Sequence, residues 1–277
     1  MGELVNNYVD YLKKNKKLSD NTLQSYKKDI EQYTKYLGNV ESSVIRKESK
    51  KIIMKYLSNL KNKDKKDATI SRKLASLRSF YQYLLVNNII QEDPTKFLES
   101  PKVQKKVPEI LSQKEIDDLL SQPECNNKKG IRDKAMLELL CATGVRVSEL
   151  MSLDIKDIDW KEKTINCKSS LKEGRKLKIS KNILEYLDNY IKKSRNSNSK
   201  EQALFVNIYG KRLTRQGFWK IIKFYKNKAR IDKDVTPHTL RHSLAVNLLK
   251  KGIDQKKIKE ILGYKDISST NMYKKLF

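Results

Sequence analysis

Apolar residues recur at helical spacing through the first 90 residues, and this periodicity constrains the fold more than any other feature of the chain. Val5, Tyr8 and Leu12, for example, fall on one face of a helix. The periodic segments span residues 5–12, 23–37, 52–60 and 69–84. Polar or charged stretches and Gly38 separate them. The pattern therefore predicts a four-helix unit with little strand character. We expect its aromatic residues to lie in the core.

A proline-containing segment at residues 93–110 follows the helical unit. Proline disfavours helix at its own position and at the residue before it, so this segment is predicted to be extended. Ser112 and Glu115 then form the sequence pattern of a capping box, which marks the start of a new helix. We therefore divide the chain into a helical domain at 1–100, a linker at 101–111 and a second domain at 112–277.

The second domain is predicted to mix helices with a small sheet. A buried helix is expected at 131–141, and the shorter apolar period between 154 and 179 predicts an antiparallel hairpin. Thr214 is the predicted cap of a basic helix that buries Phe218, Ile221, Ile222 and Tyr225. The predicted fold class is mainly α with a small antiparallel β-sheet, an all-helical domain being followed by an α+β domain.

Residues 236–273 contain the clearest candidates for catalytic side chains. Thr236 and Pro237 begin a helix, and His238 and Arg241 share the face of its first turn, opposite an expected apolar stripe of leucines 240, 244 and 248. A second helix ends at Gly263, and Tyr273 follows ten residues later. A tyrosine that attacks a phosphate, an arginine that grips its oxygens and a histidine that manages a proton would suit this pattern.

The segments PHTLRH and LGYKDISSTNMY, together with ATGVRVSEL at 142–150, resemble the motifs of the tyrosine recombinase family of phage integrases and Xer-type enzymes. This resemblance implies a helical core-binding domain that clamps DNA, followed by a catalytic domain. It also implies site-specific DNA recombination in which strands are cleaved and rejoined through a 3′-phosphotyrosyl intermediate. A type IB topoisomerase and a non-catalytic DNA-binding relative are the alternatives. Composition alone would equally allow the helical bundle to be a protein-interaction module.

The resemblance also implies a catalytic set. Its members are Arg146, Lys172, His238, Arg241, Tyr264 and Tyr273. The identity of the catalytic lysine is left open between Lys172 and Lys168, because both lie in the same irregular hairpin loop. Alternatively, Arg146 could be a surface residue that forms a salt bridge with Glu149. The resemblance permits a role for Glu149 in orienting a positively charged group. Tyr264 stands where the family usually has His or Trp, and we expect this change to alter the rate without abolishing activity.

The charge balance predicts a polyanionic partner. Lys and Arg total 60 against 33 Asp and Glu, a net charge of +27. A Lys-rich composition with solvated faces is the simpler interpretation of the charge alone. The residues predicted to contact double-stranded DNA are Lys66, Arg72, Lys73, Arg78, Lys168, Arg175, Arg215 and Lys220.

Other features narrow the class of protein. The sequence has no P-loop, dinucleotide fingerprint or metal-ligand cluster, so we expect neither a cofactor nor a metal. Three cysteines without a disulfide or metal pattern and the absence of a signal peptide or membrane span predict a cytoplasmic, nucleoid-associated protein. The resemblance implies a homotetramer on two DNA sites, and it allows a second recombinase or an accessory protein as a further partner. It leaves open whether the role is chromosome dimer resolution in chromosome partition, DNA integration or inversion.

Only four residues follow Tyr273, whereas the resemblance implies a C-terminal helix that docks on a neighbouring subunit. The expectation from this short end is a monomer in free solution that cleaves and religates DNA but completes strand exchange poorly.

Overall fold

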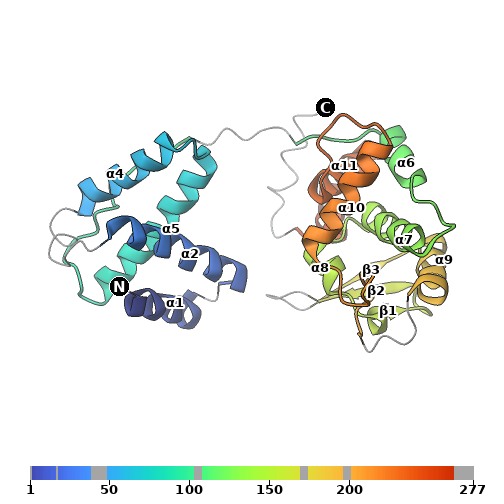
Figure 1. Cartoon of the computed structure of the whole chain (residues 1–277), viewed down its shortest axis with the longest axis horizontal. Coiled ribbons are helices and arrows are strands. Elements are labelled where there is room, and N and C mark those ends of the chain that lie inside the picture. Colours follow the sequence, from blue (N-terminus) through green and yellow to red (C-terminus); the bar gives the residue numbers. More distant parts are fainter. Residues whose placement is uncertain are drawn as a thin grey trace. The chain divides into compact units, whose positions relative to one another are not determined.

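The computed structural model describes residues 2–16, 18–38, 49–102, 108–168, 174–195 and 201–264. The chain forms two compact units, Met1–Lys106 and Val107–Phe277, and the division between them lies within the segment 101–111 (Figure 1). No helix among the described residues combines the length and the apolar composition needed to cross a bilayer.

The first unit is built from α1 (Gly2–Lys16), α2 (Asp20–Leu37), α4 (Ser49–Asn62) and α5 (Asp67–Val86). The side chain of Ser19 caps α2 at its start, and Gly38 ends this helix with φ of 62°. Helix α5 packs against α1, α2 and α4, so it forms the centre of the unit. The predicted helices and their aromatic core are confirmed, since the rings of Tyr8, Tyr33 and Tyr81 are fully buried.

A polar cluster joins α2 to α5 inside this unit. The carboxylate of Asp29 is buried and accepts hydrogen bonds from Lys73 Nζ at 3.1 Å and from Ser76 Oγ at 2.8 Å. The Arg72 guanidinium donates to the same carboxylate from the solvent side. Lys73 is only 5% exposed, so its charge is used in holding the two helices together.

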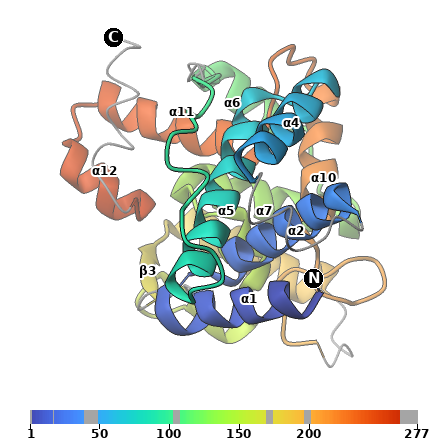
Figure 2. The same cartoon turned by 90° about the vertical axis from the view of Figure 1, so that its left-hand side faces the viewer.

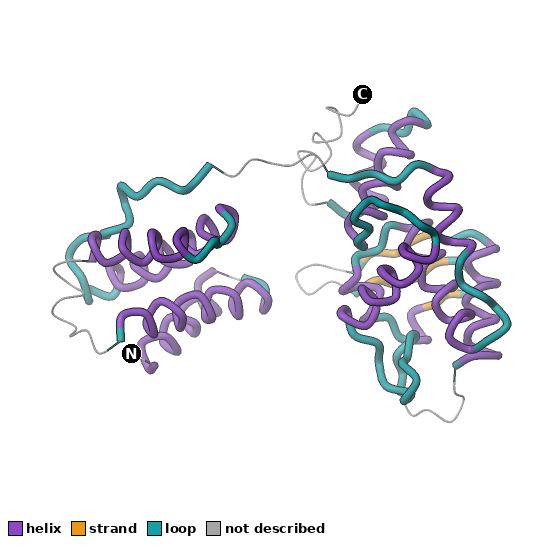
Figure 3. The backbone as a smooth tube through the Cα atoms, turned by 45° about the horizontal axis from the view of Figure 1, so that its top comes forward, coloured by secondary structure: helices purple, strands orange, loops and turns teal. Residues whose placement is uncertain are grey.

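The second unit combines helices with a short sheet (Figure 3). Its helices are α6 (Gln113–Ser121), α7 (Lys128–Thr143), α8 (Val147–Ser152), α9 (Lys181–Asn189), α10 (Arg215–Lys228), α11 (Pro237–Lys250) and α12 (Gln255–Leu262). A 3-10 turn, η1 (Ile155–Asp157), precedes the sheet, and a π-helical turn, η2 (Tyr190–Ser194), extends α9.

The sheet has three antiparallel strands in the order β1 (Ile158–Asp159), β2 (Thr164–Cys167) and β3 (Arg175–Lys178). In its register Cys167 lies opposite Arg175, at the end from which the hairpin loop leaves. The mainly α fold with a small antiparallel sheet is therefore as predicted.

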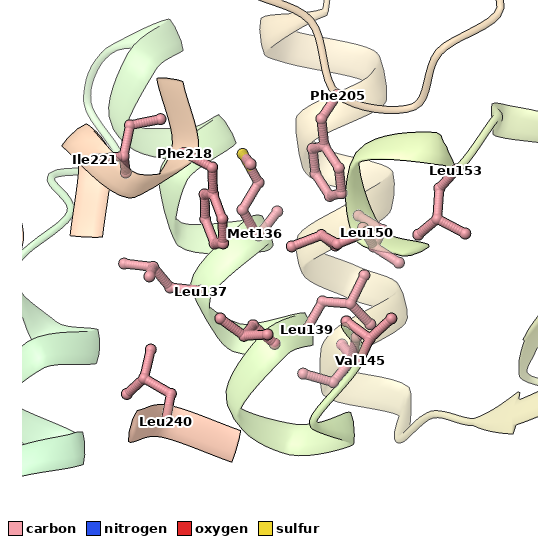
Figure 4. Packing of buried hydrophobic residues seen from close by; sticks show 14 of the residues in the cluster. Met136, Leu137, Leu139, Val145, Leu150, Leu153, Phe205, Phe218, Ile221 and Leu240 are labelled. Atoms are coloured by element: carbon pink, nitrogen blue, oxygen red, sulfur yellow. The ribbon is translucent and has the colours of Figure 1, made fainter. Parts of the chain in front are cut away.

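The core of the second unit forms around α7. Met136 and Leu137 are fully buried, and Figure 4 shows them among apolar side chains from α8, α10 and α11, including Leu150, Phe218 and Leu240. The capping box of Ser112 and Glu115 and the Thr214 cap both form, as predicted. The four apolar residues predicted to face inward from α10 are all buried.

Helix α11 differs from the expectation of one apolar and one polar face. Leu240 is buried, but Leu244 and Leu248 are half-buried, whereas Arg241 and Ser243 are deeply buried. The reason is that α11 packs against α7 and also against α12, so more than one of its faces is covered (Figure 2). Ser243 uses its hydroxyl to accept the Leu111 backbone N–H at 2.8 Å, which fixes the helix to the start of the unit.

Candidate active site

The turn after α7 brings Arg146 into position. Thr143 is the last residue of α7, Gly144 follows with φ of 58°, and Arg146 is the N-cap residue of α8. A Cβ at position 144 would lie 2.5 Å from Leu262 Cδ2, so glycine serves both the left-handed backbone and the close approach of α12. The turn after α7 and the start of α8 thus place Arg146 beside the end of α12.

Glu149 holds the Arg146 side chain through two contacts. Its Oε1 accepts from Arg146 Nη1 at 2.7 Å, and its Oε2 accepts from the Arg146 backbone N–H at 2.9 Å. Glu149 is buried while the Arg146 side chain is 39% exposed, so the guanidinium is anchored from inside and reaches the surface. The predicted ion pair with Glu149 therefore forms, and it orients a guanidinium that reaches solvent.

A second arginine shares the same carboxylate. Arg175 Nη2 donates to Glu149 Oε2 at 2.9 Å. Burial by itself would raise the pKa of Glu149, but the Arg146 backbone N–H, the charge of Arg175 and the side-chain hydrogen bonds of both arginines outweigh it, so the pKa lies below its usual value. Glu149 is therefore ionised at neutral pH.

Arg241 is deeply buried, with 4% of its surface exposed. It donates from Nη1 to the Gly144 carbonyl and from Nη2 to the Leu262 carbonyl. Burial lowers the pKa of Arg241, the Tyr264 side chain opposes this effect, and the charges of Arg146 and Arg175 add to it. The guanidinium lies 4.7 Å from the centroid of the Tyr264 ring, a cation–π arrangement.

Three arginines meet at the C-terminal end of α12. Arg175 Nη1 donates to the Ile261 carbonyl at 2.7 Å, Arg241 to that of Leu262, and Arg146 to that of Gly263. The last carbonyls of a helix lack partners within the helix and carry the negative end of its dipole. The site thus uses a helix end to gather three positive groups from segments far apart in the sequence.

The histidines lie on α11. His238 is exposed in the first turn of this helix, which begins with the predicted Thr236 cap and Pro237. His242 lies one turn later, with its ring centroid 6.3 Å from that of His238. Burial lowers the pKa of His242, and the neighbouring His238 and Arg241 lower it further.

Of the two candidate lysines the structure describes only Lys168. Its Nζ contacts Asp154 Oδ2 at 2.9 Å and Asp157 Oδ2 at 3.5 Å, at the base of the hairpin. The hydrogen bond to Asp154 raises the pKa of Lys168, so the side chain is an ammonium at neutral pH. Lys172 and Tyr273 lie outside the described residues.

The predicted DNA-contact residues have different surroundings. Lys66, Arg72, Arg215 and Lys220 are exposed. Arg78 donates to the Leu98 carbonyl and to Ser100 Oγ, and so fastens the segment after α5. Lys73, which is also predicted to contact DNA, is buried on Asp29, with only 5% of its surface exposed.

Sequence reasoning missed two features of this unit. The guanidinium of Arg175, a predicted DNA contact, binds Glu149 and the Ile261 carbonyl of α12, and no local sequence pattern indicates partners so distant in sequence. Helix α10 also exposes aromatic rings beside its cations, with Lys223 Nζ lying 4.0 Å from the centroid of the Trp219 ring.

Comparison with known proteins identifies the family to which the chain belongs. Residues 109–277 match the Phage integrase family, and residues 5–88 match the N-terminal SAM-like domain of phage integrases. The chain therefore belongs to the phage integrase family of tyrosine recombinases, as its motifs indicated.

Individual relatives are similar to this chain over nearly its whole length. The sequence is 44% identical over 274 residues to the tyrosine recombinase XerD of Oceanobacillus iheyensis, covering 97% of this chain and 92% of that protein. The crystal structure of XerA recombinase is 26% identical, with a TM-score of 0.56 over 98% of this chain and 92% of that one. The structure of a lambda integrase dimer bound to a COC' core site shares the fold, with a TM-score of 0.75 at 17% identity and coverage of 99% and 94%.

Proposed function

We propose that this chain is a site-specific DNA recombinase that cleaves and rejoins DNA strands through a 3′-phosphotyrosyl intermediate. The observation that carries the proposal is the convergence of Arg146 and Arg241 at the end of α12, where the buried carboxylate of Glu149 orients Arg146. Relatives named tyrosine recombinases and neighbours solved on DNA support the same function.

In the proposed reaction Tyr273 Oη attacks the scissile phosphorus. A bond forms between Oη and phosphorus, the bond from phosphorus to the 5′ oxygen breaks, and a 5′-hydroxyl leaves. His238 takes the tyrosine proton, and Lys172, or alternatively Lys168, gives a proton to the leaving oxygen. The reverse sequence, with a 5′-hydroxyl as nucleophile, rejoins the strand without external energy.

The arginines supply electrostatic stabilisation in this mechanism. Arg146 and Arg241 would donate to the non-bridging oxygens, where negative charge grows as the tyrosine attacks. Their hydrogen bonds to the Gly144, Leu262 and Gly263 carbonyls use only some of the five N–H groups of each guanidinium. Because these contacts exist before DNA binds, little reorganisation is needed when the phosphate arrives.

The proposed partner is double-stranded DNA in the nucleoid. The net charge of +27 and the exposed cations Lys66, Arg215 and Lys220 favour contact with phosphates. The lambda integrase neighbour is a dimer on its core site, which supports more than one subunit on DNA. A homotetramer on two sites, acting alone or with a second recombinase or an accessory protein, completes the proposal.

The test measures formation of a covalent protein–DNA adduct on a suicide substrate, in which cleavage releases a short fragment and so prevents rejoining. Wild-type protein should remain attached to the 3′ phosphate after denaturation, and Tyr273→Phe should bind the same DNA without forming the adduct. Tyr264→Phe is the matched control because it removes the other tyrosine hydroxyl in this motif. An adduct that persists in Tyr273→Phe would refute the assignment of the nucleophile.

A second assay separates recombination from topoisomerase activity. A recombinase exchanges strands between two copies of its site, whereas a type IB topoisomerase relaxes supercoiled plasmids that carry no such site. Efficient relaxation of plasmids of unrelated sequence, without exchange between two sites, would favour the topoisomerase.

A further inference from the structure

We propose that Arg175 is a positioning residue of the cleavage reaction, acting on Arg146 through Glu149, and that it does not contact DNA phosphate. The inference rests on the proposed function, because it assigns Arg146 to the scissile phosphate. It changes the role of a residue whose sequence position suggested a DNA contact.

The first argument is the geometry of the Arg175 side chain. Nη2 donates to Glu149 Oε2 at 2.9 Å, and Nη1 donates to the Ile261 carbonyl at 2.7 Å. The side chain is 19% exposed, and a Cβ at position 263 would lie 2.7 Å from Nη1, so the guanidinium lies against the backbone of Gly263. A planar fork with two acceptors at this spacing suits arginine, whereas lysine offers a single point charge.

The second argument is the connection from Arg175 to Arg146. Both guanidinium groups bind the Glu149 carboxylate, Arg146 through Oε1 and Arg175 through Oε2. They also bind nearby carbonyls at the end of α12, those of Gly263 and Ile261. Without Arg175, Glu149 would keep Arg146 as its remaining arginine partner among the described residues, so the carboxylate that orients Arg146 would be less constrained.

The third argument is the place of Arg175 in the sheet. It is the first residue of β3 and pairs with Cys167 of β2, next to Lys168. Arg175 therefore ties the base of the hairpin that carries both candidate lysines to α8 and α12. One side chain links three parts of the proposed site.

The experiment compares Arg175→Ala and Arg175→Lys with Lys176→Ala, which removes an exposed cation from the next position of the same strand. Single-turnover cleavage at saturating DNA, DNA affinity across a salt series and thermal melting are measured for each protein. We expect Arg175→Lys to melt close to wild type and keep its salt slope, yet to cleave about 10- to 100-fold more slowly, as for a misplaced catalytic group. Lys176→Ala should cleave at the wild-type rate.

An epistasis test then asks whether Arg175 acts through Arg146. In an Arg146→Ala background, Arg175→Lys should slow cleavage less than about threefold, because the group it positions is already gone. A full additional loss in that background would overturn the proposal. So would a wild-type rate for Arg175→Lys combined with a salt slope about one unit shallower for Arg175→Ala, which is the behaviour of a phosphate contact. Failure of the proposed function is distinct, since wild type and Lys176→Ala would then form no adduct.

Discussion

The guanidinium of Arg241 lies 4.7 Å from the centre of the Tyr264 ring, with the arginine buried beneath it. Tyr264 is where the family resemblance implies His or Trp, and all three residue types present an aromatic ring. The ring therefore packs on the arginine and shields it from solvent, and the Tyr264 side chain also hydrogen-bonds to Arg241.

This relationship predicts different outcomes for two substitutions of Tyr264. Tyr264→Phe keeps the ring and should cleave within a few-fold of wild type. Tyr264→Ala removes a cation–π contact of roughly 0.5–2 kcal/mol, which corresponds to a loss of about 2- to 30-fold in single-turnover rate. Equal losses in the two variants would show that the hydroxyl is what matters.

Arg146→Ala and Arg241→Ala should each slow cleavage by about 10²–10³-fold, the scale for losing one preorganised donor to a developing oxyanion. Their stabilities should differ. Arg241→Ala leaves the Gly144 and Leu262 carbonyls without this donor in the interior, at a cost of about 1–3 kcal/mol for each such group. Differential scanning calorimetry should therefore give a lower Tm for Arg241→Ala than for Arg146→Ala. The reverse order would mean that Arg146 has the larger structural role.

The lowered pKa of Glu149 predicts a pH-dependent contribution to stability. Because the pKa of the folded state lies below the usual value of 4.5, the ionised carboxylate stabilises the fold above about pH 4.5. This contribution is lost as the pH falls through the folded-state pKa. Urea unfolding at pH 7 and pH 4 should show a larger loss for wild type than for Glu149→Gln.

Glu185→Gln is the control for this experiment, because Glu185 is exposed and its ion pair with Lys181 has an N–O distance of 3.8 Å. Its pH dependence should match wild type. If Glu149→Gln also matches wild type, Glu149 does not stabilise the fold through its charge.

Binding to DNA should weaken steeply with salt. If about six phosphates are neutralised, log K should fall with a slope near −5 against log salt. Lys220→Ala should make the slope shallower by about one unit, since this residue is exposed on α10. Lys73→Met should lower stability and leave the slope unchanged, because Lys73 is buried on Asp29. A shallower slope for Lys73→Met would return this lysine to the DNA interface.

The sequence by itself determined the local structure and the family. Capping signals such as Ser112 with Glu115 and Thr236 with Pro237 act between residues a few positions apart. The helix starts that they specify therefore do not depend on distant parts of the chain. Apolar periodicity identified the helices of the first unit for the same reason. The motifs around Arg146 and Arg241 likewise indicated the tyrosine recombinase family before any fold was known.

Only the tertiary structure decided which cations serve the fold, which serve the site and which face solvent. Lys73 and Arg175 look like surface cations in the sequence, but their partners Asp29 and Ile261 lie 44 and 86 residues away. Burial of a charge depends on what packs over it and on whether a partner arrives at hydrogen-bonding distance. Both conditions depend on which distant segments pack against each other, here α2 against α5 and β3 against the end of α12. A local sequence pattern does not specify such contacts.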